Sequence, residues 1–492
     1  MRFPMTIRSI ACAALLDGPD YTTRGPGRLT LRDGRIAALD RADQAPGGAE
    51  EAAEPLFALP ALVNAHDHGR PIRSSSFGAA GKPLEVWLNY LALMPAVDPY
   101  LAAAASLGRS ALGGAGAVMV HYTRAQGLSP LPEEAAEVAR AARDIGLRIA
   151  FAVALKDRNP LVYGPSEELL ALLPEDARRE FARRTAAAPL SPADQIRLVE
   201  EVAAAAEGEM VNVQFGPTGV QWCSPELLQA VADASARSGR RIHMHCLETR
   251  YQREWADRRF PDGLFPYLKR IGLLSPRLTL AHCTWIRPEE MDILAETGVT
   301  VTVNTASNLG LRSGIAPLAE MVSRGCRVAL GLDGLAFNED DDALGEMRLA
   351  NALHRGWGFD VAVSEEEMLR IALVNGRAAV TGREEGGIIA PGQPADLLLL
   401  DAGALDSDRL LDGLCPRDLL FARAGAGHIA ELVVAGRSVV QRGRLTGIDH
   451  AAVQSELLAR LRAGMGGSAA LQAALPALED AMRHYYTAAP CC

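Results

Sequence analysis

Cysteine pairs of the C-x-x-C type are absent from this chain. Its eight cysteines are scattered along 492 residues without a recognisable framework. Thiolates at short spacing build closed structural zinc sites, and disulfide frameworks are typical of small secreted chains. The pattern therefore excludes a thiolate zinc cage, and we interpret the cysteines as free thiols.

Long apolar runs and a surplus of basic residues are also missing. No segment reaches the length of about 20 apolar residues that spans a membrane, and the first residues do not resemble a signal peptide. The formal net charge is -10, whereas a nucleic-acid partner calls for a basic face. We therefore expect a cytoplasmic protein with a small-molecule partner and with no nucleic-acid or membrane partner.

Two common catalytic motifs are not found either. The sequence contains no G-x-S-x-G elbow and no P-loop. Serine hydrolysis and nucleotide-driven chemistry are thus left without support.

The two ends of the chain have a sequence pattern that is typical of a small β module. Residues 6–58 contain short alternating apolar runs interrupted by the turn pair Asp33-Gly34, and similar runs return after residue 386. We predict that segments 1–58 and 386–445 together form one β-sandwich domain. The last segment, 446–492, is predicted to be a helical tail.

Between these ends, strand-like runs alternate with helical patterns. The runs cover residues 59–68, 116–124, 148–157, 210–218, 241–248, 278–285, 299–307 and 327–334. Alternation of strands and helices is typical of a parallel sheet, and eight such units close into a barrel. The predicted fold class is therefore α/β, with a TIM-like (β/α)8 barrel over residues 59–385. The stretch 160–208 exceeds a normal connection and is interpreted as a helical insertion.

Polar side chains gather where these strands are predicted to end. His66 and His68 lie two residues apart after an apolar run, so an extended backbone would turn both imidazoles to one side. His245, His282 and Asp333 end three later apolar runs. Functional residues of α/β barrels collect at the carboxyl ends of the strands, and a catalytic metal needs about three nitrogen or oxygen ligands and an open position. The sequence predicts such a metal site.

At this point the chain resembles the amidohydrolase superfamily, in the branch of cytosine and guanine deaminases, adenosylhomocysteine-type deaminases and triazine hydrolases. The resemblance covers nearly the whole chain, and its motifs occur in one order. They are Asn64-Ala65-His66-Asp67-His68, His245-x-x-Glu248-Thr249, Ala281-His282-Cys283, Ala306-Ser307-Asn308, Gly331-Leu332-Asp333-Gly334 and Pro391-Gly392-Gln393-Pro394-Ala395-Asp396.

The resemblance implies a role for each of these polar residues. His66, His68, His245 and Asp333 would hold one divalent metal ion, zinc being favoured while iron and manganese stay open. Asp333 would also take a proton from the water that the ion activates. His282 would hydrogen-bond the nucleophile. Glu248 would protonate the substrate ring and pass a proton to the leaving group.

Related branches bind two metals through a carboxylated lysine on the fourth strand. This chain has three lysines, Lys82, Lys156 and Lys269, and none falls in the fourth strand-like run. A site for one metal is therefore favoured. Lys156 ends the third run, and either a contact with a substrate anion or a surface ion pair would explain it.

Other residues at the predicted barrel mouth are candidates for substrate binding. They are His121, Lys156, Gln221, Trp222 and Asn304. Trp222 would stack on a planar ring, although plain packing explains a tryptophan equally well. Asn304 stands where many relatives carry a histidine, which leaves the substrate open. His243 shares a strand face with His245 and is assigned to packing or to support of a ligand.

The predicted function is that of a metal-dependent hydrolase that deaminates a nitrogen heterocycle of the purine, pyrimidine, pterin or triazine type. An alternative keeps the site but hydrolyses a cyclic or linear amide or another non-peptide C–N bond. A more distant alternative is a non-catalytic barrel scaffold, which the complete ligand set disfavours. The zinc deaminases of base editors are disfavoured because their signature needs a C-x-x-C. The resemblance also implies a homodimer or a higher homo-oligomer.

Overall fold

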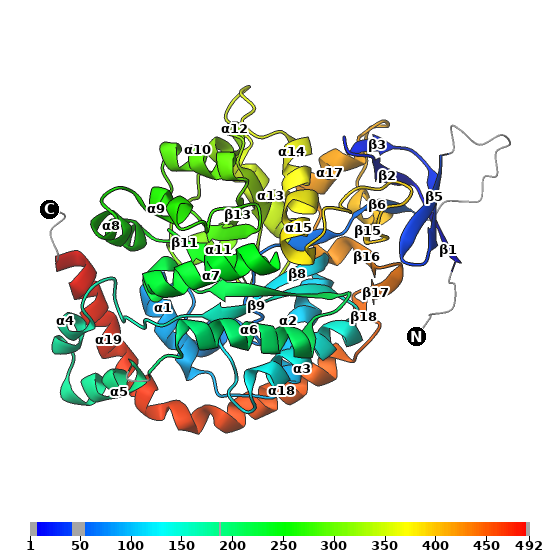
Figure 1. The fold of residues 1–492 in the computed structure, drawn as a ribbon. Coiled ribbons are helices and arrows are strands. Elements are labelled where there is room, and N and C mark those ends of the chain that lie inside the picture. The colour runs from blue at the N-terminus through cyan, green and yellow to red at the C-terminus, as the bar shows by residue number, and fades with distance from the viewer. Residues whose placement is uncertain (1–6, 42–54, 186–187, 489–492) are drawn as a thin grey trace.

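A closed parallel barrel forms the centre of the protein (Figure 1). The computed structural model describes residues 7–41, 55–185 and 188–488. In this part of the chain, each barrel strand pairs in parallel with the next along the sequence. The strands are β7 (Leu62–Asn64), β8 (Ala115–Tyr122), β9 (Arg148–Leu155), β10 (Val211–Pro217), β11 (Ile242–Cys246), β12 (Leu278–His282), β13 (Thr300–Val303) and β14 (Arg327–Leu330). The N–H of Ala65 donates to the C=O of Leu330 at 2.8 Å and joins the last strand to the first.

The interior of the barrel is filled by small side chains from alternate strand positions. Ala117 and Met119 of β8 face Ala150 and Ala152 of β9 in one buried cluster. Because side chains alternate along a strand, the next inward position on β8 is His121, which is fully buried. On β8 the apolar inward positions therefore come first, and the polar one lies at the carboxyl end of the strand. The predicted α/β barrel is confirmed.

Helices cover the outside of the barrel and fill the connections between strands. Those up to β12 are α1 (Leu84–Tyr90), α2 (Pro99–Leu112), α3 (Leu131–Ile145), α4 (Ser166–Ala171), α5 (Glu175–Thr185), α6 (Pro192–Ala206), α7 (Pro225–Ser238), α8 (Arg250–Arg259) and α9 (Leu264–Arg270). Those after it are α10 (Pro288–Thr297), α11 (Thr305–Gly310), α12 (Leu318–Ser323), α13 (Ala343–His354), α14 (Glu365–Arg370) and α15 (Gly376–Thr381).

Two further sheets, built from both ends of the chain, lie beside the barrel (Figure 1). The first sheet contains β1 (Ile7–Cys12), β4 (Gly27–Arg32) and β5 (Arg35–Arg41). The second contains β2 (Ala14–Asp17), β3 (Thr22–Arg24), β6 (Leu56–Pro60), β15 (Leu397–Asp401), β16 (Ile429–Val434), β17 (Arg437–Gln441) and β18 (Arg444–Leu445). Apolar residues of both sheets form a separate core between them. The predicted small sandwich made from the N- and C-terminal segments is therefore present.

The stretch 160–208 contains helices of two kinds. Helix α6 packs against α3, α7 and β10 and so serves as the ordinary connection between β9 and β10. Helices α4 and α5 pack instead against the C-terminal helix α19 (Ala469–Ala488), with which they share a small apolar core. The inserted part is thus shorter than the predicted insertion.

The C-terminal segment is helical and runs across the barrel. Helix α18 (His450–Gly464) packs on α2, and α19 continues to α4 and α5 at the far side (Figure 1). Short helices α16 (Ala402–Leu405) and α17 (Pro416–Arg423) precede it in the small domain. The domain limits at residues 58, 385 and 445 stay predictions, and residues 1–6, 42–54 and 489–492 of the predicted segments lie outside the described residues.

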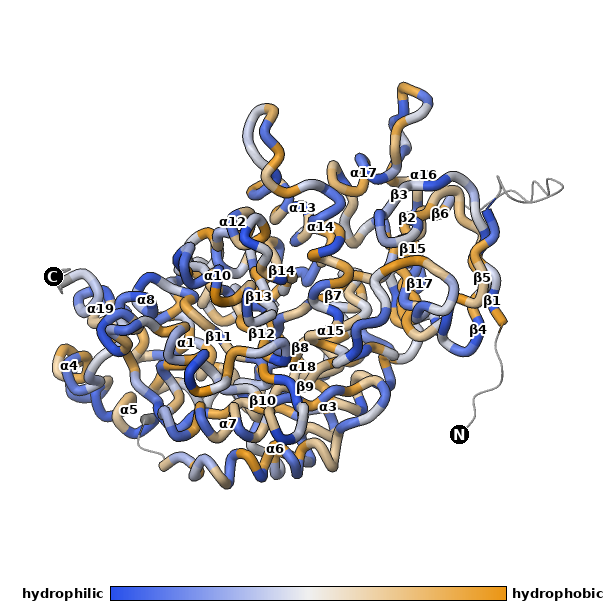
Figure 2. Tube along the Cα trace, turned by 45° about the horizontal axis from the view of Figure 1, so that its top comes forward, coloured by the Kyte–Doolittle hydropathy of each residue, from blue (hydrophilic) through white to orange (hydrophobic). Residues whose placement is uncertain are grey.

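The distribution of apolar residues follows this architecture. Figure 2 shows β6 and β15 as hydrophobic along most of their length, whereas the outer helix α8 is hydrophilic. None of the helices in the described ranges combines the length and the apolar character that crossing a bilayer would require.

Candidate active site

The loop that follows β7 carries the first pair of histidines. His66 and His68 lie just beyond the strand, with ring centroids 5.0 Å apart and planes at 79°. The carboxylate of Asp67 accepts hydrogen bonds from Asn64 Nδ2 and from the N–H groups of His68 and Gly334. It therefore points away from both imidazoles and fixes the loop to the one after β14.

Hydrogen bonds define which nitrogens of His68 and His245 are free to bind a ligand. Nδ1 of His68 lies 2.8 Å from the C=O of His121, and Nδ1 of His245 lies 2.6 Å from the C=O of Thr218. A carbonyl only accepts, so each Nδ1 carries the proton and each Nε2 presents a bare lone pair. These two Nε2 atoms are 3.1 Å apart. Two lone pairs at this distance repel each other unless they share a cation.

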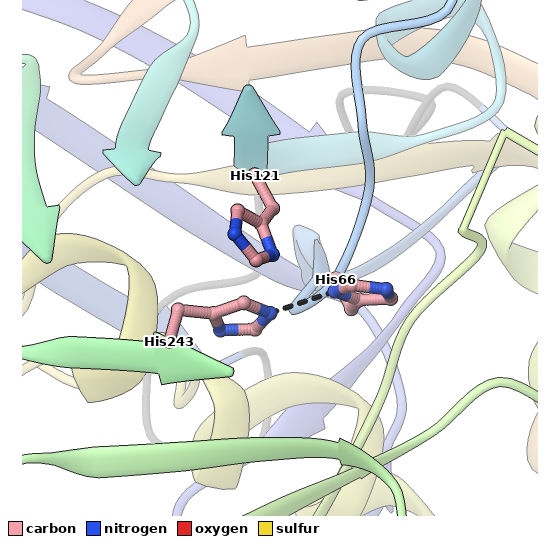
Figure 3. Close-up of side chains that lie close together, drawn as sticks. All are labelled: His66, His121 and His243. Atoms are coloured by element: carbon pink, nitrogen blue, oxygen red, sulfur yellow. Dashed lines mark hydrogen bonds between the residues drawn. The ribbon is translucent and has the colours of Figure 1, made fainter. Parts of the chain in front are cut away.

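His66 completes the imidazole group from the barrel floor. Its Nδ1 lies 2.7 Å from Nε2 of His243, as the dashed line in Figure 3 shows. Its Nε2 is buried and has no hydrogen-bond partner among the described residues. Gly331 allows this approach, because a Cβ there would lie 2.7 Å from Cβ of His66.

Asp333, in the loop after β14, faces the same point. Its Oδ1 lies 3.2 Å from Nε2 of His68 and 3.5 Å from Nε2 of His66, while Oδ2 accepts from the Ser307 hydroxyl at 2.6 Å. Burial alone would raise the pKa of Asp333, but Arg70 and His68 outweigh it and hold that pKa well below its usual range. The carboxylate is therefore ionised.

The four side chains form a donor set that fits a metal ion. Two groups, His66 with His68 and Asp333, and His66 with His245 and His282, each place their ligand atoms within 4.8 Å of one another. Burial lowers the pKa of His66, His68 and His245, assisted by neighbouring imidazoles for His66 and His245, and an imidazole must be neutral to bind a metal. Three neutral imidazoles with one carboxylate could hold a divalent ion and leave a position for water.

Backbone strain concentrates at the ends of the barrel strands. The φ angles are 47° at Leu247, 76° at His282, 46° at Cys283 and 43° at Asp333. Residues other than glycine rarely adopt this left-handed region, and such strain tends to collect at functional sites. Here it turns His282 and Asp333 toward the centre of the barrel mouth.

Glu248 lies beside the cluster, next to His282. Oε2 of Glu248 is 3.7 Å from Nε2 of His282, and its Oε1 accepts from the Ser313 hydroxyl at 3.2 Å. Burial raises the pKa of Glu248 to about 7, against the opposing effect of His282. A carboxyl group with this pKa both gives and takes a proton near neutrality.

His282 presents its free nitrogen to the same space. Its Nδ1 lies 2.9 Å from Oδ1 of Asn308, which makes Nδ1 the protonated atom. Its Nε2 is buried and has no hydrogen-bond partner within the described ranges. This nitrogen lies 4.0 Å from Oδ2 of Asp333 and can accept a hydrogen bond from a group placed between them.

A cavity of about 420 Å³ opens directly above these side chains. His68, His245, Glu248, His282 and Asp333 form its base. A cavity of this size accommodates a small organic molecule.

The residues predicted to bind substrate separate into two groups. Lys156 and Trp222 line the cavity, whereas His121, Gln221 and Asn304 are buried outside its lining. Substrate contact by any of the five stays a prediction.

Two of the three residues outside the lining, His121 and Asn304, contact the surroundings of the cluster from behind. Nε2 of His121 lies 3.0 Å from the C=O of Gly216, and its ring stacks on that of His245 at 4.9 Å. Nδ2 of Asn304 lies 3.2 Å from Nδ1 of His282. Figure 3 shows His121 and His243 together on one side of His66, and their ring centroids are 5.4 Å apart.

Two residues that the sequence reasoning did not single out also contact Asp333. Ser307 belongs to a quoted motif but had no assigned role, and its hydroxyl donates to Oδ2. Arg70 lies 3.3 Å from Oδ1 through Nη1 and rests over the Trp87 ring at 4.6 Å. The sequence offers one signal for Arg70, which is that it follows the candidate metal ligand His68 by two residues.

Comparison with known proteins places the chain in a family. The model of the amidohydrolase family matches residues 57–439, which cover the barrel and much of the small domain. The chain belongs to the amidohydrolase family. The recognition made from its motifs is confirmed.

Relatives of this amidohydrolase include two groups of deaminases. A 5'-deoxyadenosine deaminase of Methanopyrus kandleri is 30% identical over 88% of this chain and 93% of its own length. A 5-methylthioadenosine/S-adenosylhomocysteine deaminase of Desulfitobacterium hafniense is 28% identical over 80% of this chain and 82% of its own.

Solved structures show that the fold is shared as well. An adenosine deaminase from Xanthomonas campestris with bound zinc aligns with a TM-score of 0.74 at 23% identity, over 92% of this chain and 98% of its own. An atrazine chlorohydrolase from Arthrobacter aurescens with zinc and atraton gives 0.74 at 20% identity, over 92% and 99%.

Proposed function

We propose that this amidohydrolase deaminates a nitrogen heterocycle, with a purine of the adenosine type as the first candidate. The observation that carries the proposal is the pair of bare Nε2 atoms of His68 and His245, 3.1 Å apart beside the ionised Asp333. The cavity above them has room for a heterocycle. The names of the relatives support an adenosine-type ring.

The proposed metal ligands are His66, His68, His245 and Asp333, and zinc is the proposed ion because two neighbouring structures carry it. A divalent ion at such a site lowers the pKa of a bound water toward neutrality. Iron and manganese accept the same donors. Elemental analysis of the purified protein should give about one zinc per chain, and a protein that holds no stoichiometric metal of any kind would instead support the scaffold alternative.

The remaining groups move protons during the proposed reaction. Asp333 takes the proton from water, His282 holds the attacking oxygen through Nε2, and Glu248 protonates a ring nitrogen of the substrate. The carbon gains a bond to oxygen and loses its bond to the amino group. Glu248 takes the hydroxyl proton of the intermediate and passes it to the amino group, which leaves as ammonia. The proton held by Asp333 then returns to Glu248, so both carboxyl groups regain their starting states. Glu248 suits both steps because its pKa is about 7.

Ammonia release from a panel of adenosine-type purines, cytosine, guanine, pterins and aminotriazines tests the proposal. We expect at least one heterocycle to be deaminated. If none releases ammonia while a cyclic or linear amide is opened by the same protein, the deaminase assignment is wrong and the alternative of C–N bond hydrolysis replaces it.

Replacing Glu248 with Gln separates proton transfer from metal binding. General acid–base groups contribute roughly 10²- to 10⁴-fold to rate, so E248Q should lower kcat by that factor. Its zinc content should stay at the wild-type value, because the side chain is not among the proposed ligands. Loss of zinc together with activity would contradict the assigned role.

We further propose that the protein is cytoplasmic and forms a homodimer or a higher homo-oligomer. Large apolar side chains stand exposed on two loops, with Trp357 at 83% and Phe359 fully exposed between α13 and α14, and Leu410 at 94% between α16 and α17. Exposed apolar groups of this kind often mark contact surfaces. Light scattering of the purified protein would test the oligomeric state, and a monomer would contradict the proposed homo-oligomer.

A further inference from the structure

Four cationic side chains line the cavity above the proposed metal site. They are Arg70, Arg124, Lys156 and Arg184. Two of them are neutralised locally, because Arg70 contacts Asp333 and Arg184 pairs with Glu180 at 2.8 Å. The other two require a separate explanation.

Lys156 has no carboxylate partner in the described part of the chain, although it is held firmly in place. Gln195 of α6 accepts from its N–H at 3.0 Å and donates to its C=O at 3.2 Å. The neighbouring Asp157 is occupied by the N–H and hydroxyl of Ser224 at the start of α7. The surface ion pair that the sequence left open is therefore not formed, and the ammonium group is accessible at the cavity wall.

Arg124 lines the same cavity and follows β8, the strand that pairs with β9. Its guanidinium donates to the C=O of Met94, a neutral acceptor. Glu134 lies nearby but is engaged by the Tyr122 hydroxyl and by the N–H of Gln126. Among the described residues, Arg124 forms no ion pair within 4.0 Å, and burial lowers its pKa.

Acidic groups in the cavity do not compensate these two charges. Burial raises the pKa of Glu85, which accepts from the Thr249 hydroxyl at 2.6 Å. Glu248 and Asp333 belong to the reaction centre. Both cations are therefore available to an anion that enters the cavity.

We propose that the substrate carries an anionic substituent, a carboxylate or a phosphate, which Lys156 and Arg124 bind while the heterocycle lies over Glu248. This inference rests on the proposed deamination and names the substrate class of that site. Lysine and arginine are the side chains that recognise both anions through charge-assisted hydrogen bonds.

Three purine nucleosides that differ at one position provide the test. Adenosine is neutral, adenosine-5'-carboxylic acid carries a carboxylate, and adenosine 5'-monophosphate carries a phosphate. We expect kcat/KM for at least one anionic member to exceed that of adenosine by roughly 10- to 100-fold, the worth of a hydrogen bond to a charged group. The better of the two acids identifies the substituent.

Matched variants show whether these two residues produce the preference. Lys156→Met and Arg124→Met should each lower the ratio of anionic to neutral kcat/KM by about 10-fold, and Lys156→Arg should keep most of it. Arg184→Met, which removes an already paired cation from the same cavity, should leave the ratio unchanged. Equal ratios in wild type and both Met variants would overturn the proposal.

Calorimetry measures the binding affinity of the same three nucleosides and so tests the anion site without requiring catalytic turnover. If none of them releases ammonia, the deaminase proposal fails for purines, while tighter binding of an acid that is lost in Lys156→Met still supports the anion site. If adenosine binds as tightly as both acids, or neither acid binds, the anion site is wrong whatever the chemistry.

Discussion

At the scale of single residues, the three imidazoles of the cluster share one arrangement. His68 and His245 donate through Nδ1 to backbone carbonyls, and His66 meets His243 through Nδ1. Each Nε2 is thereby left for a ligand. A second partner of this kind fixes the tautomer and orientation of a metal-binding histidine.

Replacing His243 with Phe tests this arrangement. Phenylalanine keeps the ring volume but removes the acceptor for His66, so we expect zinc affinity to fall by roughly 10- to 100-fold. Competition with a chromogenic chelator measures it. Met244→Leu, at the neighbouring strand position, is the control and should keep the wild-type zinc affinity. If His243 only fills space, the His243→Phe variant should keep that affinity too.

Glu346 of α13 should make stability depend on pH. It accepts from the N–H groups of Thr305 and Ala306 at the start of α11, and burial raises its pKa to about 7 from 4.5. Between these values the native state holds more protons than the unfolded state, so stability falls as pH rises from 4.5 through 7, by about 3 kcal/mol.

Melting temperatures of wild type and Glu346→Gln, measured from pH 5 to pH 8, show this effect. Wild type should lose stability toward pH 8 more steeply than the variant, which has no proton to lose. Parallel curves would contradict a raised pKa in the native state.

The sequence indicated which residues gather at the barrel mouth more clearly than it indicated which residues hold them in place. His66, His68 and Asp333 follow apolar runs, and the rule that barrel strands end at one face brings them together. No local sequence pattern predicts that Arg70 contacts Asp333, because that contact depends on the packing of two loops that are distant in the sequence.

At the scale of elements, the cavity combines barrel loops with a helix from the end of the chain. Tyr486 of α19 lines the cavity, accepts a hydrogen bond from the N–H of Tyr163 at 3.2 Å and packs on the Tyr251 ring at 4.2 Å. The sequence indicated that 446–492 is helical, but helical periodicity carries no information about which distant surface a helix covers.

Tyr486→Ala should weaken substrate binding more than catalysis. Loss of an aromatic contact costs about 1 kcal/mol, so we expect KM to rise roughly fivefold with a smaller change in kcat. Steady-state kinetics on the best substrate measure both. His484→Ala, on the exposed side of the same helix, is the control, and equal KM values for the two variants would show that α19 does not contact substrate.

At the scale of the whole molecule, one buried carboxylate joins barrel and small domain. Asp396 pairs with Arg148 at 2.9 Å and with Arg377, and it accepts from the N–H of Ala435 at 2.6 Å. Burial would raise the pKa of Asp396, but the two guanidinium groups hold it below its usual range. The quoted motif ending in Asp396 thus marks a junction, which the sequence indicated only as part of the sheet module.

Asp396→Asn should therefore destabilise the protein without disturbing the centre. Breaking a buried ion pair costs about 3–5 kcal/mol, which should lower the unfolding midpoint clearly in urea. The zinc content of the folded fraction should equal that of wild type. A midpoint unchanged from wild type would show that the two parts are held together by apolar contacts alone.

The position of Tyr486 separates two tasks along the chain. Every proposed metal ligand lies far before Tyr486 in the sequence. Helix α19 thus supplies a wall of the chamber but none of the proposed ligands. A change in α19 can therefore alter which molecules the chamber admits while the ligand set stays intact.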